Sequence, residues 1–225
     1  MDYSTTQLRN ISIAGHGQTG KTTLFEHLLF VGGAIPKAES VASGKTVSDN
    51  TPEEIQRKIS IHASLANVAW KDRLINIWDT PGSSDFNGEV TSAFRASGLA
   101  VMLVDSRSGA QIETIKLWRD LDRRNKPRLV FLNHCEEDRS DVEASIQDIR
   151  KKFSAEVCAV TIPMGVGADF KGVIDVLHNK AYLVPAEGKT EEAIDINAEY
   201  KDDYEEALGV IAGAAAEGDD DIMVK

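Results

Sequence analysis

Gly15-His16-Gly17-Gln18-Thr19-Gly20-Lys21-Thr22 is the strongest fold signal in this 225-residue sequence. It matches the phosphate-binding pattern G-x-x-x-x-G-K-[ST] and lies between an apolar run, Leu8–Ala14, and a helical pattern, Lys21–Val31. In such a loop the glycines let backbone N–H groups face phosphate oxygens, Lys21 supplies a charge to the terminal phosphates, and the Thr22 hydroxyl ligates Mg²⁺. The sequence therefore predicts a nucleoside-triphosphate site made of these residues and Thr23.

A second motif, Asp79-Thr80-Pro81-Gly82, narrows the class of nucleotide-binding protein. It follows the apolar run Arg73–Trp78, which reads as a buried strand. An Asp at the carboxyl end of such a strand reaches Mg²⁺ through water, and the Gly82 N–H senses a γ-phosphate. Downstream of a phosphate loop, this motif indicates a GTPase-type switch rather than a kinase or a transport ATPase.

The composition is that of a globular protein outside the secretory pathway. Hydrophobic residues make up 42% and charged residues 27% of the chain, and Met1–Asn10 lacks the apolar core of a signal peptide. The longest apolar run, Leu99–Val104, is too short to span a bilayer. Two cysteines, Cys135 and Cys158, make no disulfide framework. We therefore expect a cytoplasmic monomer that does not contact a membrane.

The negative charge is concentrated at the C-terminal end. The formal net charge is −11, and residues 186–225 hold 13 acidic residues against three lysines. The rest of the chain is nearly neutral and shows no basic stripe typical of nucleic-acid binding. The acidic block is either a solvated face or a docking surface for a basic protein partner.

The order of patterns predicts an α/β fold with a mostly parallel, doubly wound sheet. Apolar, β-rich runs predict five strands, at Leu8–Ala14, Ile61–Trp70, Leu74–Asp79, Leu99–Val104 and Arg128–Leu132. Helical patterns occur at Lys21–Val31, Asn87–Ala96, Ile112–Asn125 and Asp141–Phe153. Lys71-Asp72-Arg73 reads as a hairpin turn, which makes one strand antiparallel.

Two segments between these elements carry further predictions. Ile112, Ile115, Trp118 and Leu121 are expected to form one apolar stripe against the core. The polar segment Gly33–Ser60 has no clear periodicity, and it lies between the two motifs, where a nucleotide-responsive switch is expected.

The C-terminal part reads as a small α+β insertion subdomain. Short strand-like runs are followed by an acidic helix, and the runs and the helix are expected at Val160–Met164, Gly172–Val176, Ala181–Val184 and about Ala198–Ala216. We therefore divide the chain into a GTP-binding core, residues 1–157, and an insertion, residues 158–225.

Further residues extend both motifs toward a known family. They are Arg9-Asn10-Ile11, Asp85-Phe86, Val104-Asp105 through Trp118, and Phe170-Lys171-Gly172-Val173-Ile174-Asp175. With them the chain resembles the G domain of bacterial elongation factor G, and the last stretch is similar to the start of that family's insertion. The switch region, Val47-Ser48-Asp49 through Ile59-Ser60-Ile61, looks more like the elongation-factor-G-like paralogues than the main translocase.

The resemblance implies a P-loop GTPase fold, GTP or GDP and Mg²⁺ as ligands, and a factor that acts on the large ribosomal subunit. It implies catalytic positions at Lys21, Gly82 and Ser83, and Mg²⁺ held by Thr22, by Ser60 and, through water, by Asp79. Class II release factors share part of this pattern. Ser83 departs from it, because the family has a His there that orients the attacking water, and losing such a group costs about 10²–10⁴-fold in rate.

The base-reading motif N-K-x-D also departs from the family. It is present as Asn133-His134-Cys135-Glu136, directly after the strand Arg128–Leu132. Glu136 is one methylene longer than the Asp that accepts two hydrogen bonds from guanine, and His134 replaces the stacking Lys. Guanine selectivity rests on a well-placed acceptor, and Glu137 or Asp138 is the alternative acceptor.

Two more departures concern the switch and the end of the chain. Arg57-Lys58-Ile59-Ser60 stands where the family has R-G-I-T; Ser60 either ligates Mg²⁺ or only begins the strand at Ile61. The family's last nucleotide-binding loop, with an S-A pair, is not found before Met223-Val224-Lys225, so we expect a fragment of a longer factor. A hydrolysing GTPase, a nucleotide-gated binding module with little hydrolysis and a P-loop ATPase all stay open.

Overall fold

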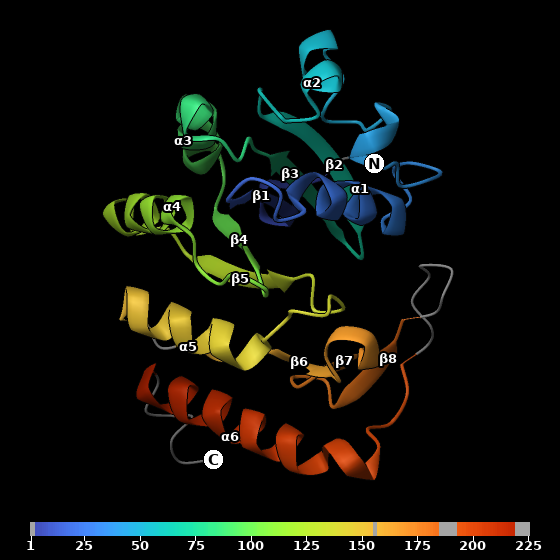
Figure 1. The fold of residues 1–225 in the computed structure, drawn as a ribbon, viewed down its shortest axis with the longest axis vertical. Coiled ribbons are helices and arrows are strands. Elements are labelled where there is room, and N and C mark those ends of the chain that lie inside the picture. The colour runs from blue at the N-terminus through green and yellow to red at the C-terminus, as the bar shows by residue number, and fades with distance from the viewer. Residues whose placement is uncertain (1–2, 155–156, 185–192, 219–225) are drawn as a thin grey trace. The chain divides into compact units, whose positions relative to one another are not determined.

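The structure is a computed structural model that describes residues 3–154, 157–184 and 193–218 (Figure 1). The chain forms two compact units. The first holds Met1–Asp105 and Ala110–Asn133, and the second holds Ser106–Gly109 and His134–Lys225. This division assigns helix α5 (Val142–Phe153) to the second unit. The domain boundary after residue 157 stays a prediction.

The first unit contains a five-stranded sheet in the order β2-β3-β1-β4-β5. Its strands are β1 (Leu8–Gly15), β2 (Ser64–Trp70), β3 (Arg73–Asp79), β4 (Leu99–Asp105) and β5 (Arg128–Asn133). All neighbours are parallel except β2 and β3, which form an antiparallel hairpin. The predicted α/β fold with one antiparallel strand is confirmed.

The hairpin forms where the sequence predicts it. Trp70 pairs with Arg73 around a two-residue turn in which Lys71 has a φ of 52°. The prediction that β2 begins at Ile61 is wrong, because the strand begins at Ser64. The backbone N–H groups of residues 61–63 instead donate to side-chain carboxylates, so they are not available to a strand ladder.

Four α-helices belong to this unit: α1 (Lys21–Val31), α2 (Pro52–Arg57), α3 (Asn87–Ala96) and α4 (Ile112–Arg123). Three 3-10 helices accompany them: η1 (Thr5–Gln7), η2 (Val41–Ser43) and η3 (Ser84–Phe86). Helices α1 and α3 have the predicted bounds, α4 ends two residues early, and α2 lies inside the segment expected to lack periodic structure.

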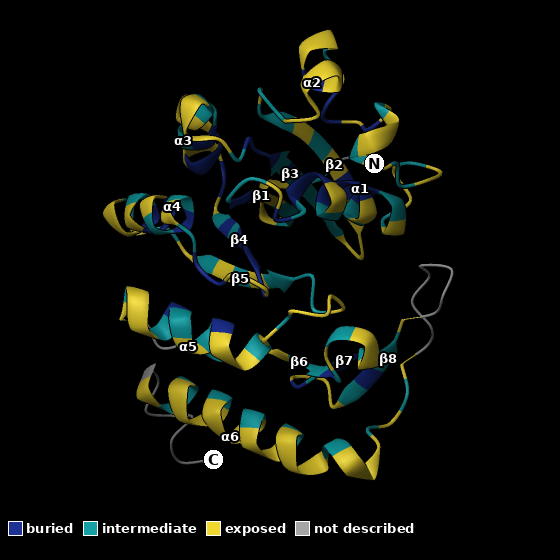
Figure 2. Cartoon of the chain, viewed as in Figure 1, coloured by how far each residue is buried: buried dark blue, intermediate teal, exposed yellow. Residues whose placement is uncertain are grey.

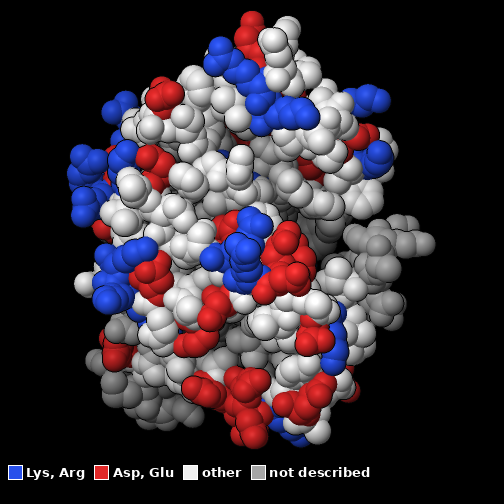
Figure 3. Space-filling view, viewed as in Figure 1, with Lys and Arg blue, Asp and Glu red and all other residues white. Residues whose placement is uncertain are grey.

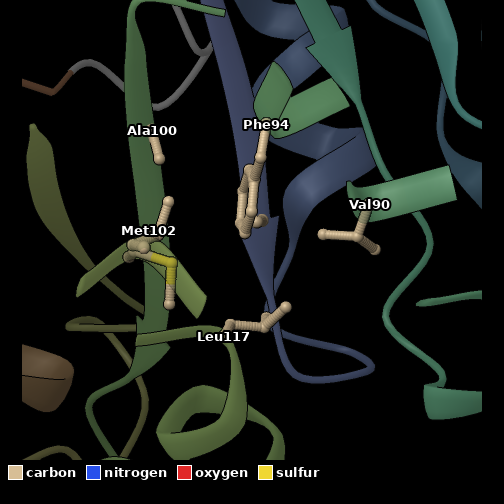
Figure 4. Packing of buried hydrophobic residues seen from close by; sticks show 7 residues of the cluster. Val90, Phe94, Ala100, Met102 and Leu117 are labelled. Carbon is tan, nitrogen blue, oxygen red and sulfur yellow. The ribbon is translucent and has the colours of Figure 1, made fainter. Parts of the chain in front are cut away.

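The core lies on both faces of the sheet because successive residues of β1 point to opposite sides. Ile13 packs with Phe25 and Leu29 of α1, while Ala14 packs with residues of α3 and α4. Figure 4 shows the second cluster, in which Phe94 lies between Val90 and the β4 residues Ala100 and Met102. Helices thus cover both faces, as expected of a doubly wound sheet.

The predicted apolar stripe of α4 is wrong at its first residue. Ile112 is 70% exposed, whereas Leu121 is fully buried. A spacing of three residues falls short of the 3.6-residue turn, so after nine residues the side chain points to the opposite side of the helix. The buried residues of α4 are Thr114, Leu117, Trp118 and Leu121.

The second unit pairs a small antiparallel sheet, in the order β6-β7-β8, with helices. Its strands and helices are α5, β6 (Thr161–Met164), η4 (Gly167–Asp169), β7 (Gly172–Asp175), β8 (Lys180–Leu183), η5 (Ala198–Tyr200) and α6 (Lys201–Gly218). The Asp141 carboxylate caps α5 by accepting from the Ala144 N–H at 2.8 Å. Tyr200 and Tyr204 pack on the core of the small sheet.

Most of α6 is exposed (Figure 2), and acidic side chains gather over it (Figure 3). Its first turn carries Asp202 and Asp203. Residues 186–192 and 219–225 of the acidic block, and with them the C-terminal Met223-Val224-Lys225, lie outside the described residues. In the described part of the chain, no helix has both the length and the apolar character needed to cross a bilayer.

Candidate nucleotide-binding site

The phosphate loop connects β1 to α1 and is braced at one carbonyl. The His16 carbonyl accepts from the Lys21 Nζ at 2.8 Å and from the Thr19 hydroxyl at 3.0 Å. Gly20 caps α1 with a φ of 90°, a left-handed conformation that glycine adopts without strain. The loop therefore turns at the N-terminus of a helix, where anions are stabilised.

Lys21 is buried at the start of α1, with 6% of its surface exposed. Burial lowers its pKa to about 8, although the nearby carboxylates of Asp79 and Asp49 act in the opposite direction. A buried ammonium group is stabilised strongly by a bound polyanion, because little water screens the attraction between them.

Asp79 lies at the carboxyl end of β3, level with Ile13 of β1 in the parallel register. The Thr80 hydroxyl donates to the Ile13 carbonyl at 2.8 Å and fixes the chain after the strand. Asp79 accepts from the Thr22 hydroxyl through Oδ2 at 2.8 Å. Burial raises the pKa of Asp79 to about 6, and the hydrogen bond from Thr22 limits that rise.

Gly82 packs directly on the phosphate loop. A Cβ at this position would lie 2.5 Å from the Lys21 Nζ and 2.8 Å from the Gly17 nitrogen, so only glycine fits without movement. Thr80 and Pro81 are buried beside it. The Asp79-Thr80-Pro81-Gly82 motif thus packs directly against the phosphate loop.

Ser83 is exposed, and its hydroxyl has a local role. The Ser83 Oγ accepts from the Asp85 N–H at 3.4 Å and caps the short helix η3. The position that carries the family's His therefore presents only a short hydroxyl, which is turned toward its own backbone.

The switch segment, residues 33–60, is folded against this site. The Ser60 hydroxyl lies 3.3 Å from the Thr22 hydroxyl, and the role of both as Mg²⁺ ligands stays a prediction. Helix α2 precedes Ser60, and a reciprocal capping box between Thr51 and Glu54 starts it, with Pro52 at its first position. The pattern Thr51-Pro52-x-Glu54 is a helix-start signal that would have predicted α2.

Asp49 and Ser48 are the site residues that sequence reasoning missed. Both are almost fully buried in the switch segment, and Ser60 lies beside the Asp49 carboxylate. Burial raises the pKa of Asp49, and its hydrogen bond with Ser60 opposes that rise. A short polar run inside a loop gives no sequence signal for burial, so only the folded segment reveals these residues.

The donor set suits a small, hard cation. Two buried carboxylate oxygens, Oδ1 of Asp79 and Oδ1 of Asp49, lack a hydrogen-bond partner in the structure, and the Ser48 hydroxyl lies beside the Asp79 carboxylate. Together with the Thr22 and Ser60 hydroxyls they offer oxygen ligands of the kind that Mg²⁺ takes alongside water and phosphate. Among the described residues, no group of three or more His, Cys, Asp and Glu side chains is arranged to hold a metal by itself.

The outer residues of the predicted site are less enclosed. Gln18 and Thr23 are exposed at either side of the loop, and His16 is half-buried, with its Nδ1 buried and without a hydrogen-bond partner. Gly15 ends β1.

The base-reading motif divides between the two units. Asn133 ends β5 in the first unit, and its Nδ2 donates to the Thr19 carbonyl at 2.9 Å, which ties β5 to the phosphate loop. His134 belongs to the second unit, where its Nδ1 lies 3.3 Å from the Arg107 guanidinium. Arg107 also lies 4.0 Å from the Glu137 carboxylate, and Glu136 is exposed.

Residues 6–221 match the family model described as the elongation factor Tu GTP-binding domain. The chain belongs to this family. It is a GTP-binding domain of the elongation-factor type. The fold is also similar to a Thermus thermophilus structure titled "Crystal structure of ttk003000868", with a TM-score of 0.89 and 27% sequence identity. The similarity covers 96% of this chain and 32% of the other, so the chain spans about a third of that protein.

Proposed function

We propose that this GTP-binding domain binds GTP and GDP with Mg²⁺ and hydrolyses GTP slowly, within an elongation-factor-G-like factor that acts on the ribosome. One observation supports it above the others. The Thr22 hydroxyl contacts both Asp79 and Ser60, so one point joins the phosphate loop, the second motif and the switch segment. A triphosphate with its cation at that point would be sensed by all three.

Each residue of this cluster has a role that follows from its position. Lys21 would direct its charge to the terminal phosphates, and Gly82, which lies against the Lys21 Nζ, would donate its N–H to the γ-phosphate. The Thr22 and Ser60 hydroxyls would hold Mg²⁺, and Asp79 would hold one of its waters. The bound cation supplies charge neutralisation at the β- and γ-phosphates.

Slow hydrolysis follows from Ser83. Its hydroxyl accepts from the Asp85 N–H at 3.4 Å, and Ser83 has no imidazole to orient a water. The same observation favours the second candidate, a nucleotide-gated binding module with very little hydrolysis. A release-factor-like GTPase would share the site, and a P-loop ATPase would differ from it in base preference.

The remaining proposals concern partners and setting. The exposed, acidic α6 suits a basic ribosomal protein on the large subunit. We propose that the full factor works in the cytoplasm, where its ribosomal partner is found, and that this domain is monomeric.

Equilibrium titration with GTP, GDP and ATP tests nucleotide binding and base preference. The unmodified domain should bind GTP and GDP in Mg²⁺ and prefer both to ATP. Lys21→Ala should remove triphosphate binding, whereas Lys71→Ala, on the exposed β2–β3 turn, should have no effect. A loss below about tenfold in Lys21→Ala, about 1.4 kcal/mol, would contradict the assignment of the phosphate loop.

Single-turnover phosphate release tests the chemistry. Ser83→His should raise hydrolysis, most of all in the full-length factor with ribosomes, and Ser84→His on the same exposed turn is the matched control. Fast hydrolysis by the unmodified protein that Ser83→His does not improve would mean that another group positions the water. No hydrolysis by either protein, with tight GTP binding, would favour the nucleotide-gated module.

A further inference from the structure

Three consecutive backbone N–H groups after Ser60 donate to carboxylates. The N–H groups of Ile61 and His62 donate to Oε1 of Glu54 at 3.0 and 3.1 Å, and that of Ala63 donates to Oε2 of Glu89 at 2.8 Å. Hydrogen bonds to charged groups are worth more than those between neutral groups. The end of the switch segment is therefore fixed by side chains from α2 and α3.

Glu26 of α1 fixes an earlier part of the switch segment in the same way, by accepting from backbone N–H groups. The Glu26 carboxylate accepts from the Val47 N–H at 2.6 Å and from the Glu39 N–H at 3.1 Å. Glu26 is fully buried and lies one helical turn after Thr22. The switch segment is thus tied to the helix whose first turn faces the phosphates.

Glu54 has no spare acceptor capacity for solvent. Its Oε2 accepts from the Thr51 N–H at 3.1 Å and from the Thr51 hydroxyl at 2.7 Å, and the residue is 1% exposed. Burial alone would raise the pKa of Glu54, but the hydrogen bonds from Ile61, Thr51 and His62 lower it below its ordinary value. The buried carboxylate is therefore charged and depends on these donors.

A helix-capping role explains only half of these contacts. A capping box uses the carboxylate to bind the N-cap backbone, which is the Thr51 contact. Oε1 accepts from Ile61 and His62, which lie beyond the end of α2 and directly after Ser60, the residue proposed to ligate Mg²⁺. Because Ser60 directly precedes Ile61, fixing the N–H groups of 61 and 62 fixes the backbone that carries the Ser60 hydroxyl.

We propose that Glu54 is a positioning residue that sets the Ser60 hydroxyl beside Thr22, with Glu26 holding residues 39 and 47 of the switch segment on α1. The proposal rests on the proposed function, in which Ser60 and Thr22 hold the cation of a bound triphosphate. It adds that carboxylates of the chain itself set the geometry that senses the triphosphate. GDP, which lacks the γ-phosphate, should depend on it much less.

The variant Glu54→Gln tests this in two measurements. An amide offers one acceptor oxygen and places N–H donors against the remaining donors, so hydrogen exchange of the Ile61 and His62 amides in the nucleotide-free domain should speed up at least about tenfold. Affinity for a non-hydrolysable GTP analogue in Mg²⁺ should fall about tenfold, and GDP affinity less than about threefold. Glu53→Gln, an exposed neighbour on the same turn, should change neither.

Two further variants separate positioning from general stability. Thr51→Ala removes the capping hydroxyl and should weaken α2 while the Ile61 and His62 amides stay protected, because their acceptor remains. Ser60→Ala should lower analogue affinity without loosening those amides. In the Ser60→Ala background, Glu54→Gln should cost no further analogue affinity, because Glu54 acts through Ser60.

These measurements test the positioning role of Glu54 separately from nucleotide binding by the domain. Unchanged amide exchange in Glu54→Gln overturns it, as does an equal loss of analogue and GDP affinity, or additive losses in the double variant. If the unmodified domain binds neither nucleotide, the proposed function fails, and the exchange measurement still decides whether Glu54 holds the backbone. Should Glu54→Gln not fold, Glu54→Asp, whose shorter carboxylate retracts from Ile61 and His62, replaces it in every arm.

Discussion

GTP affinity should fall as the pH rises from 7 to 8.5, because Lys21 loses its proton in the free site. Burial lowers the pKa of Lys21 to about 8, with Asp79 and Asp49 opposing the shift. The phosphates of a bound nucleotide raise that pKa again, so binding above pH 8 takes up a proton. The affinity for GTP should therefore be constant below the pKa that Lys21 has in the free domain, and should fall above it.

The size of the effect follows from the pKa. The protonated fraction of Lys21 falls from about 0.9 at pH 7 to about 0.24 at pH 8.5, so the association constant should fall about fourfold. A fluorescent GTP analogue titrated at constant ionic strength and saturating Mg²⁺ measures it. Lys21→Arg keeps every other titrating group, and its guanidinium stays charged. A flat profile for the unmodified domain, or an equal slope for Lys21→Arg, would show that Lys21 does not lose a proton in this pH range.

The buried Asp79 carboxylate titrates at about 6, above its unfolded value, so its charge costs the folded state stability at neutral pH. Asp79→Asn should therefore raise the unfolding free energy of the nucleotide-free domain at pH 7 by about 1–3 kcal/mol in urea titrations, and weaken Mg²⁺-dependent GTP binding. Gly82→Ala places a Cβ 2.8 Å from the Gly17 nitrogen and should weaken GTP binding at least about tenfold by calorimetry; full affinity would mean that this loop moves freely. Glu136→Asp should raise the preference for GTP over ATP in competition titrations, and an unchanged preference would direct attention to Glu137 or Asp138.

Much of the fold was predictable because its signals are local. The run Leu8–Ala14, the eight-residue loop and the helix to Val31 occur in the structure with almost the predicted bounds. Apolar runs bounded by turn residues have few alternatives in a parallel sheet. The α4 stripe was mispredicted at Ile112 because a three-residue spacing was extended over more turns than the helical period allows.

The switch segment shows where local signals end. Its polar residues read as a loop, yet Ser48, Asp49 and Glu54 are buried in the structure. A polar side chain can be buried when its partners come from distant parts of the chain, and hydrophobic periodicity carries no information about such partners. Because the N–H groups of Ile61 and His62 donate to Glu54, β2 begins at Ser64 rather than at Ile61. The strand propensities of these residues carry no information about that partner.

The chemistry of the phosphate loop, the second motif and the departures at Ser83 and Glu136 can all be read from residue types, because residue type fixes what a side chain can donate or accept. The meeting of the Thr22 hydroxyl with Asp79 and Ser60, residues far from it in the chain, becomes visible in the folded chain. The same is true of the packing of Gly82 on the phosphate loop. Parallel strand pairing brings the ends of β1 and β3 to one edge of the sheet, because both strands run in the same direction. Hydrogen bonds from backbone N–H groups to the buried carboxylates of Glu26 and Glu54 then hold the switch segment beside that edge.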